Sequence, residues 1–513
     1  MHWTRKTLIL LLIIITGSLL FLQYKFKSEI INTIENKLPP NIQLNYDKID
    51  VNVFSGVVKM DSLTIKLFST NDTIITTLNA NNFKITGFSL WQLLMKNTIY
   101  IEDVIFENPD LEYYQYQQAK ELNSNKEFDK IININKISFL NGSLKIKNET
   151  KDRLLLRMDS IYFTMNDLNT DSDKIKGKIP FDYHGFQLKS QQLFLNLSTY
   201  EELKISSLSV KNDKFELKDV HLKTKFTKEK LSAKISLERD HIQLHIPELT
   251  LNGLDYGFNN NKFYLTIDRS LMVKPSLKLY RDKTIADDLN IKSMYSKKLR
   301  ELPFDLSLHH LKITEGYISY AENVDTIDEA GELFFNDVNA DLTNLTNRSN
   351  KGGNTAISTT SNFMGKAPMD LSIRFDVGNK NDVFLTSGQF KNFNAEIANT
   401  FFESNLNAKA EGIIEEVYFT FNGNNLKSKG DLKMKYKEFK FEILDKKNRV
   451  NKLLSAIGNL FVNDGSKTDQ DGYRYGEIDV ERDKTKSFFN YLWINVQDGL
   501  VSTLTGKGEK NKK

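Results

Sequence analysis

From Pro40 onward, apolar and polar residues alternate along most of the chain. Residues 63–67, 215–220 and 371–377 show this period of two, and Asn, Asp, Gly and Ser interrupt the runs. Successive side chains of a β-strand point to opposite faces, so alternation is typical of strands with one buried face. The pattern predicts a mainly β protein. Between Pro40 and Lys440, only residues 90–95 and 395–403 are expected to be helical.

Four ten-residue segments share a template with apolar residues at positions one, three, eight and ten and turn formers at five and six. They are residues 51–60, 104–113, 137–146 and 311–320. If positions five and six form a two-residue turn, all four apolar side chains lie on one face of a hairpin. The template predicts hairpin turns at Ser55-Gly56, Asn141-Gly142 and Glu315-Gly316, with a looser corner at Asn108-Pro109.

The apolar positions of this template are the candidate binding site. A sheet with one apolar face could cover a sealed core or form a groove open to acyl chains, and alternation does not distinguish the two. In a groove, each buried methylene of a lipid tail would contribute roughly 0.8 kcal/mol. The predicted lipid-binding residues are Val51, Val53, Val58, Met60, Val104, Phe106, Leu111, Tyr113, Ile137, Phe139, Leu144, Ile146, Leu311, Ile313, Ile318 and Tyr320.

The N-terminus contains an apolar stretch of membrane-spanning length. Residues 8–15 are all apolar, residues 19–22 continue the run, and Trp3 and Tyr24 stand where interfacial aromatics belong. The alternative is a cleaved signal peptide with a poor small-x-small site around Thr16. We predict an uncleaved transmembrane anchor that holds a large body outside the cytoplasm.

Helices are predicted at both ends of the body. Residues 28–38 have helical apolar spacing and precede Pro39-Pro40, which indicates a short amphipathic helix near the membrane. Two further apolar stripes occur at residues 453–461 and 488–504. The second could pack over the open end of a sheet or meet a membrane or partner. The predicted membrane contacts are Phe488, Phe489, Leu492, Trp493 and Val496.

Composition excludes several kinds of chemistry. The chain has no Cys, which excludes thiolate catalysis and Cys-ligated zinc, and its net charge of +4 gives no reason to expect nucleic acid as a partner. His241 and His245 have the spacing of a helical zinc site but lie in a period-two segment, where they would be about 13 Å apart. We interpret them as surface or groove-lip histidines. No catalytic motif, metal or cofactor is predicted, and the protein is expected not to be an enzyme.

Residues 49–67 and 88–113 resemble the start of AsmA-like envelope proteins. The shared features are the N-terminal anchor, the amphipathic helix, a strand pair, and a "helix, strand, then x-Asn-Pro-x-apolar" passage that ends at Tyr113. The resemblance implies an elongated curled antiparallel sheet, or β-groove, behind a transmembrane helix in the inner membrane, with the body in the periplasm. It also implies transport of phospholipid or another lipid between envelope membranes, or support of outer-membrane assembly.

These observations divide the chain into six parts. They are the anchor (1–27), the juxtamembrane helix (28–40), an N-terminal β-groove region (41–205), a middle β region (206–300), a C-terminal β region (301–445), and C-terminal helices with a basic tail (446–513). The C-terminus is a candidate contact for outer-membrane or other envelope proteins. The alternative function is an anchored envelope scaffold whose apolar faces are simply core.

Overall fold

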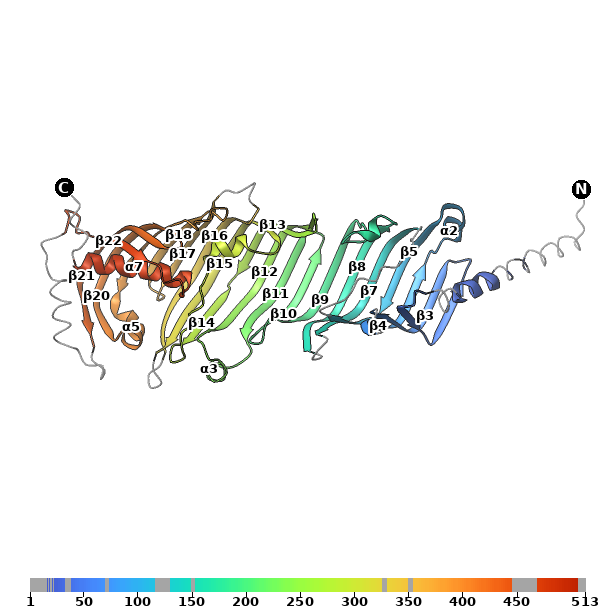
Figure 1. The fold of residues 1–513 in the computed structure, drawn as a ribbon, viewed down its shortest axis with the longest axis horizontal. Coiled ribbons are helices and arrows are strands. Elements are labelled where there is room, and N and C mark those ends of the chain that lie inside the picture. The colour runs from blue at the N-terminus through green and yellow to red at the C-terminus, as the bar shows by residue number, and fades with distance from the viewer. Residues whose placement is uncertain are drawn as a thin grey trace, which may run out of the picture. The chain divides into compact units, whose positions relative to one another are not determined.

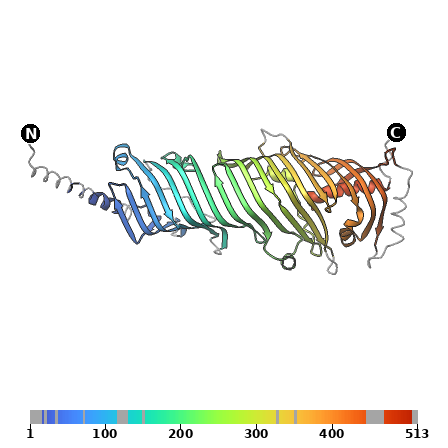
Figure 2. The same cartoon turned by 180° about the vertical axis from the view of Figure 1, so that it is seen from behind.

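A computed structural model shows a mainly β protein (Figure 1; Figure 2, from behind). The structure describes residues 16, 18, 21, 23–32, 38–69, 73–115, 130–148, 153–324, 330–348, 354–444 and 468–505. These residues form 22 strands and a few helices, of which all but one in the body are short. The chain forms two compact units, residues 1–199 with 203–215 and residues 200–202 with 216–513. The division falls within two consecutive strands, β10 (Glu201–Lys211) and β11 (Lys214–Thr224).

Unit 1 is a mixed sheet in which most neighbours are antiparallel. Its strands are β1 (Ile42–Asn45), β2 (Lys48–Asn52), β3 (Val57–Phe68), β4 (Ile74–Thr86), β5 (Thr98–Glu107), β6 (Asp110–Gln115), β7 (Ile131–Asn148), β8 (Arg153–Thr170) and β9 (Gly185–Asn196). Strand β3 pairs with β1, β2 and β4, and β7, β8 and β9 pair in sequence, all antiparallel. Both β5 and β6 pair antiparallel with β4 on one side and parallel with β7 on the other. The two strands therefore occupy a single strand position in the sheet, which is broken between them and is called the interrupted line below.

The interruption between β5 and β6 is made by Asn108-Pro109. Proline lacks the N–H that a central strand donates, so the hydrogen-bond ladder must break there. Asn108 takes a φ of 49°, its amide donates to the carbonyl oxygen of Leu140 (2.8 Å), and the Ser143 amide donates to that of Pro109 (2.7 Å). Asn141, opposite on β7, has a φ of 58° and donates from its side chain to the Asn108 side-chain oxygen at 2.8 Å.

Unit 2 contains a longer series of strands. They are β12 (Asp240–Asn259), β13 (Lys262–Val273), β14 (Ser276–Asp282), β15 (Asp305–Asn323), β16 (Gly331–Thr346), β17 (Thr355–Phe363), β18 (Ala367–Phe375), β19 (Phe384–Asn394), β20 (Ala408–Gly423), β21 (Lys427–Ile443) and β22 (Arg474–Glu481). From β15 to β22, each strand pairs antiparallel with the next.

The first strands of unit 2 repeat the interrupted line of unit 1. Both β13 and β14 pair antiparallel with β12 and parallel with β15. Lys274-Pro275 separates the two strands, and Lys274 has a φ of 51°. The Lys274 amide donates to the carbonyl oxygen of Thr314, and the Tyr317 amide donates to that of Pro275, each at 2.8 Å. The same broken strand, with the same pair of backbone hydrogen bonds, thus occurs once in each unit.

The hairpin predictions were mostly wrong. Residues 137–146 lie within β7 and residues 311–320 within β15, so Gly142 and Gly316 are in mid-strand. The template's turn residues are instead bulges with positive φ at Asn141 and Glu315, and the pairing register shifts beside both. Residues 104–113 run along β5 and β6 and form no hairpin.

Of the four template segments, only residues 51–60 form a hairpin. Its register is two residues from the prediction, since Val51 pairs with Val58 and Ile49 with Met60. The connection therefore takes in residues 53–56, and Val53 is part of it. A bulge and a turn use the same residue types, Asn and Gly with positive φ, so the template could not separate them.

Two further predictions on the fold have clear outcomes. The sheet is mixed where an antiparallel one was expected, because β5, β6, β13 and β14 run parallel to their next long strand. The predicted helices at 90–95 and 395–403 are confirmed as α2 (Leu90–Lys96) and as η2 (Ala395–Ala398) with α5 (Asn399–Leu406). Three short helices were not predicted. They are η1 (Lys174–Lys176), α3 (Lys228–Ser232) and α4 (Tyr295–Arg300).

Residues 23–32 are helical and pack on the first strands of unit 1. The Gln23 side chain donates to the carbonyl oxygen of Val51 (2.7 Å) and accepts from the Val53 amide (2.8 Å). Ile30 packs against the small core formed by Val51, Val58, Met60, Leu63 and Ala80. Of the residues that the structure describes, none belongs to a helix long and apolar enough to cross a bilayer. The predicted anchor at residues 3–24 lies almost entirely outside those residues, as does the stripe at 453–461.

The larger core lies in unit 2, where α7 (Phe488–Thr505) packs on β20, β21 and β22. The helix approaches closely because glycines stand on both surfaces. A Cβ at Gly476 of β22 would come within 2.5 Å of the Gly499 carbonyl oxygen. Asn495, fully buried, accepts a hydrogen bond from Ser428 at 2.6 Å. This part of unit 2 is a sheet covered by a helix.

Candidate functional site

A row of phenylalanines crosses five strands of unit 1 on one face of the sheet. The ring centroids of Phe83 and Phe106 are 4.8 Å apart, those of Phe106 and Phe139 5.1 Å, those of Phe139 and Phe163 5.6 Å, and those of Phe163 and Phe186 6.3 Å. The residues belong to β4, β5, β7, β8 and β9 in turn. Strand pairing explains the row, because Phe83, Phe106, Phe139 and Phe163 are direct cross-strand partners.

Aliphatic residues extend this face on both sides of the Phe row. On one side, Ile85 pairs with Val104, which pairs with Ile137. On the other side, Leu111 pairs with Leu144, beyond the line of bulges. Phe106 and Leu111 are five residues apart, which would place them on opposite faces of a regular strand. The positive-φ residue Asn108 takes one residue out of the alternation, and the apolar side chains remain on one face.

The rings of the Phe row are only half-buried. At the start of the row, Phe83 and Phe106 pack against the small core that Ile30 contacts. Of the described residues, only strands of the sheet have extensive contacts with β7 and β8. That differs from the α7 region of unit 2, where Phe421, Leu432 and Ile478 are at most 2% exposed.

The opposite face of the same strands is charged. The Lys145 ammonium lies 3.2 Å from the Asp110 carboxylate and 3.4 Å from that of Glu112, and Lys147 lies 3.6 Å from Glu112. Partial burial acts to lower the pKa of Lys145, but hydrogen bonds and charges from Asp110 and Glu112 outweigh it, and the pKa is raised. The sheet of unit 1 thus has an apolar face here and, behind it, a face with a partly exposed network of ion pairs.

The structure distributes the sixteen predicted lipid-binding residues over three places. Val51, Val58 and Met60 are buried in the small core of unit 1, and Val53 packs against it. The second and third sets lie on β5, β6 and β7 around the Phe row; they are Val104, Phe106, Leu111, Tyr113, Ile137, Phe139, Leu144 and Ile146. The fourth set lies on β15 in unit 2, and its members, all half-buried, are Leu311, Ile313, Ile318 and Tyr320.

Three members of the Phe row were not among the predicted residues. Phe83, Phe163 and Phe186 lie on strands that do not match the template. In the sequence, these strands are indicated only by the alternation of apolar and polar residues, which predicts strands but not their order in the sheet. Which strands are neighbours depends on pairing between segments far apart in the sequence, and local spacing carries no such information.

The helix at residues 488–504 is confirmed as α7. Of its predicted membrane contacts, Phe488 is 8% exposed, and Leu492 and Val496 pack against the core. Phe489 is 63% exposed and Trp493 is half-buried. The helix also provides acceptors for β22, since the amide of Asp479 donates to the Asp498 carboxylate at 2.9 Å. A membrane contact through Phe489 and Trp493 stays a prediction.

The histidines of β12 have different surroundings from those expected. His241, predicted to be a surface or groove-lip residue, is buried (4% exposed), with its Nε2 2.9 Å from the carbonyl oxygen of Phe226. His245 is half-buried and stacks on His221 of β11. His221 was not among the predicted site residues, because it is 24 positions from His245 and only strand pairing brings the two together.

No family model matches the chain, and no curated protein is significantly similar to it.

Proposed function

We propose that this chain is a membrane-anchored, non-enzymatic protein of AsmA-like type that binds lipid acyl chains on a curled β-groove. In this proposal the apolar stretch of residues 8–22 is held in the inner membrane and the body lies in the periplasm. The protein transfers lipid between envelope membranes or supports outer-membrane biogenesis, and its C-terminus meets envelope partners. The observation that carries the proposal is the half-buried Phe row of unit 1, backed by a charged face.

The size of the apolar face suits one acyl chain. Strands in a sheet are about 4.8 Å apart, so a row over five strands is about 19 Å long. One leaflet of a bilayer has a hydrocarbon thickness of about 15 Å, half of the whole core. A lipid tail laid along the row could therefore bury most of its length. At roughly 0.8 kcal/mol per methylene, this burial can offset the cost of leaving the bilayer.

The charged reverse face supports the same arrangement. A sheet that is apolar on both faces would need cover on both, whereas here the ion pairs of Lys145 with Asp110 and Glu112 keep one face in water. Only the Phe face then needs an apolar partner, and a lipid tail satisfies that requirement without a second protein layer.

Site-specific photocrosslinking tests this proposal. A benzophenone amino acid at position 139 or 163 of the full chain, expressed in a diderm bacterium, should crosslink to lipid that mass spectrometry can identify. The matched controls are Leu140 and Tyr162, which are 39% and 51% exposed and point to the opposite face. These should give no lipid adduct.

Charge substitutions provide the second test. Phe139→Glu should fold but carry less co-purified lipid, because in an open groove the carboxylate can reach water. Leu140→Glu should leave lipid occupancy unchanged. If Phe139→Glu unfolds unit 1, and position 139 never crosslinks to lipid, the face is a core and the scaffold function replaces the lipid function.

A further inference from the structure

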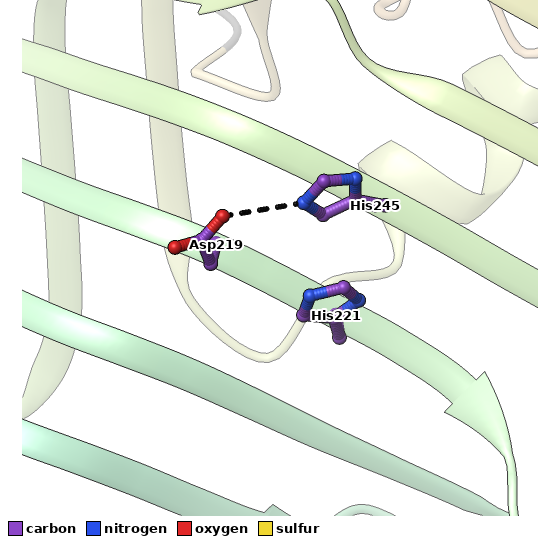
Figure 3. Close-up of side chains that lie close together, drawn as sticks. All are labelled: Asp219, His221 and His245. Atoms are coloured by element: carbon purple, nitrogen blue, oxygen red, sulfur yellow. Dashed lines mark hydrogen bonds and ion pairs between the residues drawn. The ribbon is translucent and has the colours of Figure 1, made fainter.

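Asp219, His221 and His245 form a compact cluster on two adjacent strands of unit 2 (Figure 3). Asp219 and His221 belong to β11, and His245 belongs to β12. The Nε2 atom of His245 is 3.4 Å from a carboxylate oxygen of Asp219. The two imidazole rings stack with centroids 4.2 Å apart and planes inclined by 8°. The potential ligand atoms of all three residues lie within 4.8 Å of one another.

The local fold explains this convergence. The amide of Ile242 donates to the Thr224 hydroxyl at 2.9 Å, three residues before His245 and three after His221. Residue numbers rise on one strand as they fall on the other, so β11 and β12 run antiparallel with the two histidines opposite each other. Asp219 has a φ of 50°, a conformation that Asp tolerates better than most residues. This bend in β11 brings its carboxylate toward His245 (Figure 3).

Each residue of the cluster offers an atom that first-row transition metals accept as a ligand. An imidazole binds through a ring nitrogen and a carboxylate through an oxygen. The cluster therefore brings two imidazoles and one carboxylate within 4.8 Å of one another.

We propose that Asp219, His221 and His245 bind a divalent first-row transition-metal ion, with Zn²⁺ as the representative. Zinc–ligand bonds of 2.0–2.1 Å in a tetrahedron place ligand atoms about 3.3 Å apart. The His245–Asp219 separation of 3.4 Å matches this value. Parallel stacked rings direct their lone pairs side by side, so His221 and His245 turn about their soft χ2 torsions when the ion enters. Three protein ligands leave the fourth position to water or an external ligand.

Other histidine–carboxylate pairs in unit 2 provide a comparison. His310 Nε2 is 2.8 Å from Asp341, and His309 Nδ1 is 3.4 Å from Asp268. Each of these pairs has one imidazole and one carboxylate, without a second imidazole. Among the described residues, only the Asp219 cluster brings three such ligand atoms within 4.8 Å of one another. Imidazole is a preferred ligand of Zn²⁺, Cu²⁺ and Ni²⁺, which distinguishes this cluster from a calcium or magnesium site.

Metal titration of the purified full chain in detergent tests the proposal. After treatment with EDTA and dialysis, the protein should bind one equivalent of Zn²⁺ by calorimetry. His221→Gln and His245→Gln should each weaken binding by about tenfold or more. His310→Gln is the matched control, because it removes an imidazole from an ion pair of the same kind. This variant should bind Zn²⁺ with the affinity of the parent.

Spectroscopy of the unsubstituted chain makes the test independent of whether the variants fold. Cu²⁺ bound at one equivalent should show hyperfine coupling to two imidazole nitrogens in electron paramagnetic resonance. The proposal is overturned if the spectrum shows at most one nitrogen, if no stoichiometric Zn²⁺ binding occurs, or if both variants bind as the parent does while retaining its circular dichroism.

Discussion

The backbone amide of Ser143 donates a hydrogen bond to the carbonyl oxygen of Pro109 at 2.7 Å. This bond rejoins β7 to the interrupted line of β5 and β6 immediately after the bulge at Asn141. Tyr317 and Pro275 make the equivalent bond in unit 2 at 2.8 Å. In each unit, a glycine precedes the donor on the long strand. These glycines, Gly142 and Gly316, permit the close approach of the proline.

Replacing Gly142 by Ala should destabilise unit 1, because the new Cβ would lie 2.9 Å from Cγ of Pro109. Overpacking of this kind costs about 1–3 kcal/mol. Gly316→Ala is the matched comparison, since its Cβ would have 3.4 Å to Cγ of Pro275 and 3.2 Å to the Val338 carbonyl oxygen. Hydrogen exchange of β7 and β15 should show the larger loss of protection for Gly142→Ala. Equal losses would mean that the proline contact does not set the cost.

Glu315→Asn should stabilise β15. Glu315 has a φ of 52°, and the left-handed region costs an ordinary residue roughly 1–2 kcal/mol, whereas Asn adopts it more readily. The substitution loses an ion pair with Lys274 at 3.1 Å, but both side chains are about 60% exposed, and such pairs contribute little. A net gain of up to about 1 kcal/mol is expected, measured as slower hydrogen exchange in β15. Faster exchange would contradict it.

The sequence predicted which apolar residues share one face of the sheet, but not the backbone geometry that places them there. The template placed Phe139 and Leu144 on the same face by a hairpin, whereas one continuous strand with a bulge between them gives the same result. Both solutions change the phase of the alternation by one residue, so apolar spacing cannot separate them. The difference lies in the partner strands, and Phe163 and His221 were missed for the same reason.

Glu238→Gln should destabilise unit 2. The Glu238 side chain is 4% exposed and lies 2.6 Å from Lys283, with Arg281 and Lys486 each at 3.7 Å. Hydrogen bonds to charged groups contribute about 1.5–3 kcal/mol, and the neutral amide loses most of this while keeping its shape. Chemical denaturation of the full chain should show a lower free energy of unfolding for this variant than for the parent.

Asp287→Asn is the control for this network. Asp287 lies 2.7 Å from Lys486, but its side chain is 48% exposed. Exposed pairs contribute at most about 1 kcal/mol, so the free energy of unfolding of this variant should be close to that of the parent. If Asp287→Asn proves as costly as Glu238→Gln, the surface pair rather than the buried carboxylate holds the segment before α7.

Gly499→Ala separates helix propensity from packing in α7. In an exposed helix, this substitution stabilises by about 1 kcal/mol. Here the Cβ would come within 2.8 Å of Leu432 Cβ and 2.9 Å of Ile478 Cγ1, both fully buried. Moving the helix outward would also stretch the bond between Asn495 and Ser428, which is 2.6 Å long. We therefore expect a net loss of about 1–3 kcal/mol, measured by denaturation and by faster exchange in α7. Gln497→Ala, at an exposed position of the same helix, should be neutral or stabilising. Stabilisation by Gly499→Ala would show that α7 can move away from β21 and β22 without cost.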